Sequence, residues 1–315
     1  MPLHLSPTCP SLSTNRAAYL RVNQDALDGF IQADRADILV LVDGKPVVRS
    51  DPARTRTRLA RFGPHDLGSL RDARELVFLG LDEAARPGPR GIFAFFLTAE
   101  KAMHIGQDRG LCEPAVDVRS LAMQGTMPTV DLSLATTAVA LSHWVSSSRY
   151  CGRCGNPTKL HDGGWRSSCD VCAASTFPRT DPVVIMLVTD GVHCVLGRQS
   201  QFPDGMFSAL AGFIEPGETI EHAVAREVME EVGLAVDSVA YEASQPWPFP
   251  HSLMIGCVAT AAHHPLSIDQ TELQDARWFD RAELRAMLAG QHDGGLWLPG
   301  PHAIARWLVT RFADG

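Results

Sequence analysis

Short apolar runs separated by turn-forming residues dominate the first 132 residues of the chain. Between Ala36 and Val48, two such runs flank an Asp-Gly pair, which favours the tight turn of a β-hairpin. The segments RELVFLGL (74–81) and GIFAFFLTAE (91–100) have the length and apolar content of buried strands. A helix is expected at about 132–150. The pattern predicts a mixed α/β domain over residues 1–148 that ends in a linker helix, with no recognisable chemistry of its own.

Residues 177–315 combine strand patterns with a few helical ones. The segment PVVIMLVTDGVHCVLGRQ (182–199) predicts two strands joined by an Asp-Gly turn, and further strands are expected at 238–244 and 253–261. A long helix is expected just before Gly233, and shorter helices at 281–288 and 302–312. This mixture predicts an α/β sandwich for the C-terminal domain.

Composition and charge exclude several classes of protein. Hydrophobic residues make up 45% and charged residues 20% of the 315 positions, which is ordinary for a globular protein. The formal net charge is −8 and no block of Lys and Arg occurs, so the broad basic surface of a nucleic-acid-binding protein is missing. The opening residues lack the features of a signal peptide, and no apolar run is long enough to cross a membrane. We therefore expect a cytoplasmic protein without membrane contact.

Four of the eight cysteines form two CxxC pairs. These are Cys151 with Cys154 and Cys169 with Cys172, separated by 14 residues. Each pair can present two thiolates to one tetrahedral ion, so the spacing predicts a zinc ribbon over 149–176. Four thiolates leave no open position on zinc, which makes the ion structural. The alternative, a nucleic-acid-binding ribbon, is disfavoured because only Lys159 and Arg166 supply fixed positive charge between the pairs.

The helical segment before Gly233 carries an acidic arc beside an apolar one. At about 100° per residue, Glu227, Glu230 and Glu231 fall within roughly 100° of one another. The neighbouring arc holds the apolar residues Val224, Ala225, Val228, Met229 and Val232. If the apolar arc packs on a sheet, the three carboxylates converge, and such an oxygen cluster suits Mg²⁺ or Mn²⁺. A solvated acidic surface would explain the glutamates alone equally well.

The residues around these glutamates follow a longer pattern. Gly212 is followed after five residues by Glu218, and after seven more by Arg226-Glu227-Val228, Glu230-Glu231 and Gly233-Leu234. This resembles the Nudix box, G-x5-E-x7-R-E-U-x-E-E-x-G-U (U aliphatic), at every specified position. The resemblance implies a loop–helix–loop metal site on an α/β/α sandwich that acts on nucleoside diphosphates linked to another group.

The same resemblance assigns roles to individual residues. It implies that Glu227, Glu230 and Glu231 hold the metals, that the Ala211 carbonyl adds a ligand, and that Arg226 pairs with Glu218 to brace the loop. Gly212 and Gly217 would let the backbone approach the phosphates. Glu272 matches a further acidic residue near the metals, either a ligand or a general base.

The string SQPWPFPHS (244–252) narrows the resemblance. Three prolines and two aromatic residues predict a stiff, extended loop that can form a pocket wall, although a rigid connector would have the same composition. Together with the cysteine pairs upstream, the string resembles the NADH pyrophosphatases, also known as NAD-capped RNA hydrolases. This subgroup implies substrate contacts at the matching positions, which are Gln245, Pro246, Trp247, Pro248, Phe249, Pro250, His251, Ser252, Phe177, Phe213, Ala305 and Arg119. One departure is Gly164, which stands where the subgroup can have a glutamate contact.

The sequence thus predicts an α+β chain with three parts: the mixed α/β domain (1–148), the zinc ribbon (149–176) and a Nudix catalytic domain (177–315). The resemblance implies metal-dependent cleavage of NADH or NAD to NMNH or NMN and AMP, with NAD-capped RNA as a related substrate, and a homodimer. Two alternatives stay open. One is a Nudix hydrolase for ADP-ribose or another nucleoside diphosphate, and the other is a non-catalytic zinc-ribbon adaptor.

Overall fold

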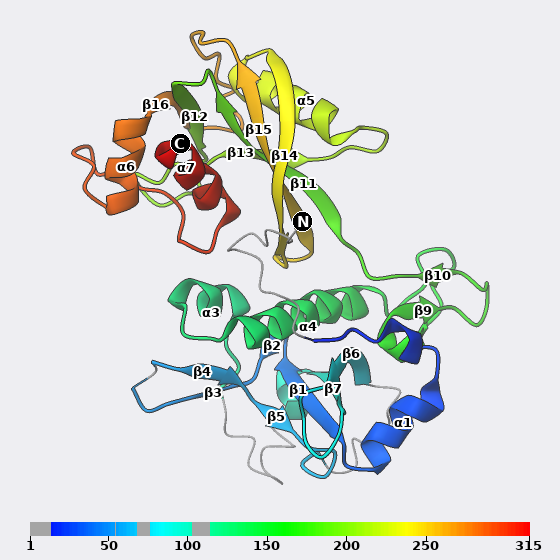
Figure 1. Ribbon diagram of the computed structural model, residues 1–315. Helices are drawn as coiled ribbons and strands as arrows, with labels where there is room; N and C mark the ends of the chain where they lie inside the picture. The colour runs from blue at the N-terminus through cyan, green and yellow to red at the C-terminus, as the bar shows by residue number, and fades with distance from the viewer. Residues whose placement is uncertain (1–13, 54, 68–75, 103–113) are drawn as a thin grey trace. The chain divides into compact units, whose positions relative to one another are not determined.

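The computed structural model describes residues 14–53, 55–67, 76–102 and 114–315. The chain forms two compact units. The C-terminal unit comprises Thr180–Trp247 and Ser252–Gly315, and the N-terminal unit comprises the described residues up to Arg179 together with Pro248–His251 (Figure 1). The cysteine-rich segment 149–176 therefore belongs to the N-terminal unit. No helix among the described residues is long and apolar enough to cross a membrane.

The N-terminal unit is built on a five-stranded mixed sheet. Its strands run in the order β2-β1-β7-β6, with β5 also paired to β1. β1 and β7 are parallel, whereas β1 and β2 form the predicted hairpin around Asp43-Gly44. Both turn residues have positive φ, at 47° and 75°, which suits an Asp-Gly pair. The strands are β1 (Ala36–Val42), β2 (Lys45–Pro46), β5 (Arg61–Phe62), β6 (Leu76–Asp82) and β7 (Arg90–Leu97), and a separate pair is β3 (Val48–Ser50) with β4 (Thr57–Leu59).

Both faces of this sheet are buried. Leu39 and Leu41 of β1 point into a core shared with α4, while the alternating residues Ile38 and Val40 point into a core shared with α1. The N-terminal domain is thus mixed α/β, as expected (Figure 1). The helices of this part are η1 (Ala18–Leu20), α1 (Gln24–Gln32), α3 (Val118–Gln124) and α4 (Thr129–Ser147), the last of which was predicted from the sequence.

The cysteine-rich segment adds a small antiparallel sheet. Its three strands are β8 (Lys159–His161), β9 (Arg166–Ser168) and β10 (Ser175–Thr176), with the short helix η3 (Asp162–Gly164) between the first two. The indole Nε1 of Trp165 donates a hydrogen bond of 2.7 Å to the Phe78 carbonyl of β6, so this sheet is tied to the larger one.

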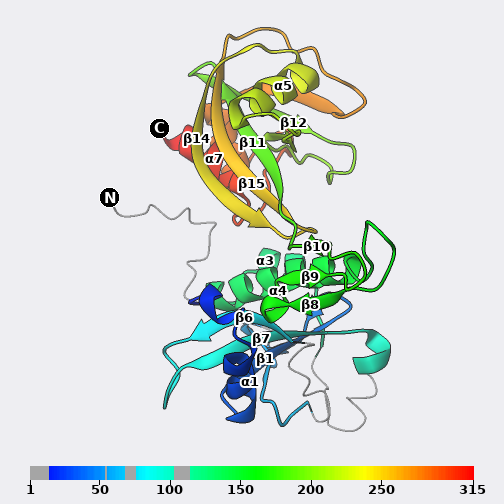
Figure 2. The same ribbon diagram turned by 90° about the vertical axis from the view of Figure 1, so that its right-hand side faces the viewer.

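The C-terminal unit is a six-stranded mixed sheet between helices. Its order is β14-β15-β11-β12-β16, with β13 paired to β11, and β11 is parallel to β15. Helix α5 covers one face, and α6 and α7 cover the other (Figure 1 and Figure 2). The expected α/β/α sandwich is confirmed. The elements are β11 (Asp181–Thr189), β12 (His193–Arg198), β13 (Leu210–Phe213), α5 (Ile220–Val232), β14 (Val236–Trp247), β15 (Ser252–Ala261), β16 (Asp275–Asp280), α6 (Arg281–Ala289) and α7 (Ile304–Asp314).

The expected loop over 244–252 is mostly strand. β14 continues through Trp247, and Pro246 pairs with Leu253 of β15, so only Pro248–His251 form the turn. A proline is tolerated there because β14 lies at the edge of the sheet and needs no donor on its outer side. The strand β16 was not predicted from the sequence.

Candidate active site

Three carboxylates meet beside helix α5. Glu227 and Glu231 come from the helix, Glu272 comes from the loop before β16, and each offers an oxygen within 4.8 Å of the other two. Glu231 is only 2% exposed because it lies on the side of α5 that packs Val224 and Val228 against the sheet. The backbone N–H of Asp269 donates to the Glu231 carbonyl at 3.0 Å, which holds the Glu272 loop against the helix end.

The electrostatics of this group favour a bound cation. Burial, reinforced by the charges of Glu227 and Glu272, raises the pKa of Glu231 to about 8. Burial also raises the pKa of Glu227, against the opposing effect of Arg226. The Oε2 atom of Glu231 is buried and has no hydrogen-bond partner within the part of the chain that the structure describes. The three carboxylates therefore fit a divalent cation, which would satisfy this atom and neutralise the repulsion.

Arg226 joins the loop before α5 to the helix. Its guanidinium donates to both carboxylate oxygens of Glu218, at 2.7 and 2.8 Å, and to the Phe213 carbonyl at 2.9 Å. It also contacts Glu227 at 2.8 Å. The hydrogen bond from Arg226, followed by that from the Glu215 N–H, lowers the pKa of Glu218 to about 2. The loop before α5 is thereby held by the bidentate ion pair between Arg226 and Glu218, whose two parallel hydrogen bonds fix the orientation of both side chains.

Glu230 lies outside the carboxylate group, contrary to the expectation that the three helix glutamates converge. Its carboxylate is 56% exposed and pairs with Arg226 at 3.0 Å. Met229, expected on the apolar arc, is also exposed. The acidic arc of α5 spans about 100°, so the residues at one end of it can face water while those at the other end are buried against the sheet. The third carboxylate of the group is supplied by the loop residue Glu272 instead.

Gly212 makes room for Glu227. A Cβ atom at residue 212 would lie 1.8 Å from the carboxyl carbon of Glu227 and 2.0 and 2.2 Å from its oxygens. Gly212 is held in β13 opposite Val184 of β11, so the backbone cannot simply move away. The Ala211 carbonyl belongs to the peptide bond that joins it to Gly212. Because glycine has no Cβ atom, the backbone at residue 212 can lie directly against the buried carboxylate of Glu227.

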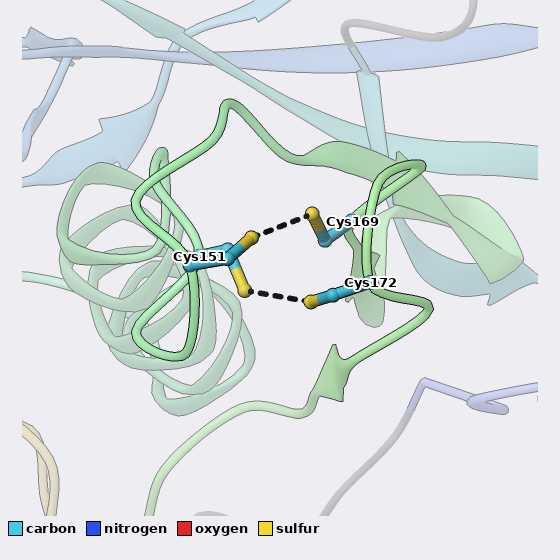
Figure 3. A group of neighbouring side chains, drawn as sticks. Cys151, Cys169 and Cys172 are labelled. Carbon is cyan, nitrogen blue, oxygen red and sulfur yellow. Dashed lines mark hydrogen bonds between the residues drawn. The ribbon is translucent and has the colours of Figure 1, made fainter.

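The four cysteines of the CxxC pairs also converge. The Sγ atoms of Cys151 and Cys172 are 3.5 Å apart, as are those of Cys154 and Cys169, and all four Sγ atoms lie within 4.8 Å of one another. Figure 3 shows the sulfur atoms turned toward a common centre. None of the four forms a disulfide. A hydrogen bond from the Asn156 side chain, followed by that from its backbone, lowers the pKa of Cys154 to about 6. This set of thiols suits a closed zinc site.

Comparison with known proteins adds to this geometry. A family model described as "NUDIX domain" matches residues 179–297, and one described as "NADH pyrophosphatase-like rudimentary NUDIX domain" matches residues 35–144. NAD-capped RNA hydrolase NudC from Mycobacterium bovis is 36% identical over 299 residues, which cover 90% of this chain and 93% of that protein. The chain belongs to the Nudix family.

The resemblance to the NADH pyrophosphatase subgroup is confirmed by the same matches. NAD-capped RNA hydrolase NUDT12 from Homo sapiens is 48% identical over 179 residues, or 54% of this chain. The chain spans only 39% of the length of that human relative. A crystal structure of a Nudix hydrolase from Nitrosomonas europaea is 19% identical with a TM-score of 0.39, and the match covers 48% of this chain and 96% of that chain.

The residues expected to contact substrate fall in both units of this Nudix protein. The C-terminal unit holds Phe213, Gln245, Pro246, Trp247, Ser252 and Ala305, and the N-terminal unit holds Arg119, Phe177, Pro248, Phe249, Pro250 and His251. Phe213 and Phe177 are mostly exposed, at 59% and 63%, and so present free ring faces. Ala305 lies in the first turn of α7 and is buried in the core of the C-terminal unit.

Gln245 is engaged within the fold. Its Nε2 donates to the His302 carbonyl at 2.7 Å, and its Oε1 accepts from the Ile304 N–H at 2.9 Å. The side chain thus completes the hydrogen bonds at the beginning of α7. Phe249 packs against the N-terminal core, and the Arg119 guanidinium lies 5.9 Å from its ring centre. The structure therefore brings these two expected residues together.

The backbone conformation and the close packing at position 164 favour glycine there. Its φ is +86°, and a Cβ atom there would lie 2.7 Å from the Val77 side chain and 3.0 Å from the Val77 backbone. A glutamate at this position would need both an unfavourable backbone conformation and a shift of β6. Packing against β6 therefore disfavours a glutamate at position 164 in this chain.

Proposed function

We propose that this protein hydrolyses the pyrophosphate of NADH or NAD, giving NMNH or NMN and AMP, and that the same site acts on the NAD cap of RNA. The observation that carries the proposal is the carboxylate group of the buried Glu227 and Glu231 with the exposed Glu272, in which one buried oxygen of Glu231 has no hydrogen-bond partner among the described residues. The names of the mycobacterial and human relatives support the choice of substrate. The Nudix box supplies the remaining machinery.

The chain's own residues divide the work of the reaction. Bound Mg²⁺ or Mn²⁺ supplies charge neutralisation on the pyrophosphate and lowers the pKa of a water molecule. Glu227 and Glu231 would hold the metal, Glu230 would join them once Arg226 releases it, and the exposed Glu272 would complete the site or accept the proton from water. Water oxygen forms a bond to one phosphorus while the bridging P–O bond breaks, so each product keeps one phosphate. Arg226 keeps the loop that faces the phosphates in place.

The aromatic residues suit the rings of the dinucleotide. Phe213 follows Gly212 directly and exposes its ring beside the carboxylate group, where a nicotinamide ring can stack. Trp247 of the same unit is a second candidate for stacking. The resemblance to the subgroup supports Phe177, Phe249 and Arg119 as further substrate contacts. Two aromatic side chains of the C-terminal unit, Phe213 and Trp247, favour a dinucleotide over ADP-ribose, which lacks the nicotinamide ring.

Three further features belong to this proposal. We infer that the four cysteines hold a structural zinc ion, because their sulfur atoms form a closed set of four ligands. We also propose a cytoplasmic location, and we infer a homodimer from the resemblance to the subgroup. Light scattering coupled to gel filtration would give twice the 34.2 kDa chain mass for a dimer.

Product analysis tests the proposed activity. Purified protein is incubated with NADH, NAD, ADP-ribose and NAD-capped RNA, each with Mg²⁺ or Mn²⁺, and products are separated by chromatography. AMP and NMNH should form, faster than ADP-ribose is cleaved. Glu231→Gln should abolish the reaction, whereas Glu221→Gln, exposed in the first turn of the same helix, should retain it. Preferred ADP-ribose cleavage would redirect the substrate assignment. No cleavage of any substrate would support the adaptor alternative.

A further inference from the structure

A second set of metal-binding side chains lies in the C-terminal unit, apart from the carboxylate group. Asp190, His193 and His263 each offer one ligand atom within 4.8 Å of the other two. The Oδ2 atom of Asp190 is 2.9 Å from Nδ1 of His193 and 2.7 Å from Nδ1 of His263. We propose that these three residues bind one Zn²⁺ ion, or a similar borderline divalent cation, at this end of the sheet.

The sheet topology brings the three residues together although they are distant in sequence. Asp190 directly follows β11, and His193 opens β12 after a short turn. β15 runs parallel to β11 with Thr260 opposite Thr189, so the chain leaving β15 carries His263 to the same edge as Asp190. Gly212 pairs with Val184, six residues before Asp190, which places the two metal-binding groups about 20 Å apart along β11. The proposed ion is thus separate from the catalytic one.

The neighbours of each residue hold it in position for binding. The Oδ1 atom of Asp190 accepts hydrogen bonds from the backbone N–H groups of Val192 and His193, at 2.7 and 2.6 Å, which leaves Oδ2 to act as a single ligand atom. The His263 ring stacks on Trp278 at 4.5 Å with an angle of 19°, and it meets the His193 ring edge-on at 4.9 Å. Such outer contacts are what orient metal ligands in established sites.

The chemistry of the ligands selects the class of ion. Two imidazoles and one carboxylate suit Zn²⁺ and its neighbours better than Mg²⁺, which prefers oxygen ligands. Ligands at about 2.1 Å from zinc in tetrahedral geometry are roughly 3.4 Å apart, so the Asp190–histidine separations of 2.9 and 2.7 Å need to widen by about 0.5 to 0.7 Å. Three protein ligands leave a fourth position for water. The ion would fasten the turn after β11 to the segment after β15.

Zinc counting tests the proposal. The full chain is equilibrated with buffered Zn²⁺ in excess Mg²⁺, which occupies the carboxylate group, and is then gel-filtered and analysed by elemental mass spectrometry. We expect two zinc ions per chain in the wild type and one in His263→Ala and His193→Ala, the remaining ion being that of the cysteines. His264→Ala is the matched control, because this exposed neighbour accepts a hydrogen bond from Trp278 through its backbone carbonyl, which the substitution keeps, and the variant should leave two ions. Far-UV circular dichroism confirms that each variant is folded.

Two results would overturn the proposal. One is a single zinc ion in the wild type, which would leave the three residues as a hydrogen-bonded arrangement only. The other is two ions in both histidine variants, which would place the second ion elsewhere. Neither result depends on whether the protein hydrolyses NADH, so the zinc site and the proposed activity are tested separately.

Discussion

The carboxylate of Glu227 occupies the space that a side chain at Gly212 would need. The nearest approach is 1.8 Å, between the position of a Cβ atom at residue 212 and the carboxyl carbon of Glu227. Such a distance is far below any van der Waals contact. The first glycine of the Nudix box is therefore required in this chain by packing against Glu227.

We expect Gly212→Ala to displace Glu227 and to disturb the metal-binding group. Overpacking of this kind destabilises a protein by about 1–3 kcal/mol, and a displacement of about 1 Å costs on the order of 100-fold in rate. Steady-state hydrolysis of NADH and thermal unfolding measure the two effects. Gly300→Ala is the control, since a Cβ atom there meets nothing within 4 Å. Full activity in Gly212→Ala would show that Glu227 is not held where the structure has it.

Arg226→Lys keeps the positive charge but loses the bidentate geometry toward Glu218. The loop from Phe213 to Glu218 should loosen, and the catalytic rate should fall by roughly 10- to 100-fold with little change in stability. Arg311→Lys provides the comparison, because Arg311 forms an exposed pair with Glu242 at 3.0 Å and should tolerate the change. Equal activities of the two variants would contradict a positioning role for Arg226.

The raised pKa of Glu231 predicts a pH-dependent stability in protein free of Mg²⁺ and Mn²⁺. An unfolded glutamate titrates at about 4.3, whereas Glu231 in the folded chain titrates at about 8, so the folded state keeps a proton that the unfolded state releases. This contribution to stability is complete below pH of about 4.3 and is lost as the pH rises to about 8. The melting temperature of the wild type should therefore fall relative to Glu231→Gln across this range. A difference in melting temperature that does not change with pH would argue against a raised pKa of Glu231.

Cys151→Ser should remove one zinc ion per chain and lower the melting temperature of the N-terminal unit, because binding of a structural ion contributes to folding. Elemental analysis and calorimetry measure the two effects. Gly152→Ala, at an exposed position where a Cβ atom meets nothing within 4 Å, should change neither. Unchanged zinc content in Cys151→Ser would refute the zinc ribbon.

Local patterns in the sequence predict local features well. The Asp43-Gly44 hairpin, the strands around the second Asp-Gly turn and the cysteine group all depend on residues that are close in the chain, and all are present in the structure. The helix periodicity likewise placed Glu227 and Glu231 beside the apolar arc of α5, and both are buried in the structure. The motif itself carried the family assignment.

Features that depend on distant residues were not accessible in this way. The helical arc gave no measure of how far burial reaches around α5, so Glu230 was grouped with Glu231 although it faces solvent. Gln245 was matched to the substrate, yet its amide caps α7 through backbone groups nearly 60 residues away. Asp190 and His263 are 73 residues apart, and the sequence did not predict their contact, because the parallel pairing of β11 and β15 brings them together.

The edge strand β14 limits how copies of this protein can associate. A long, regular edge strand offers its free backbone groups to a strand of another molecule and so promotes aggregation. In β14 the register with β15 is broken between Val236 and Ser238 and again between Tyr241 and Ala243, and Pro246 lacks an N–H to donate. These irregularities make continuous sheet extension across two molecules unfavourable. The twelve-residue edge is therefore protected from pairing with a strand of another molecule.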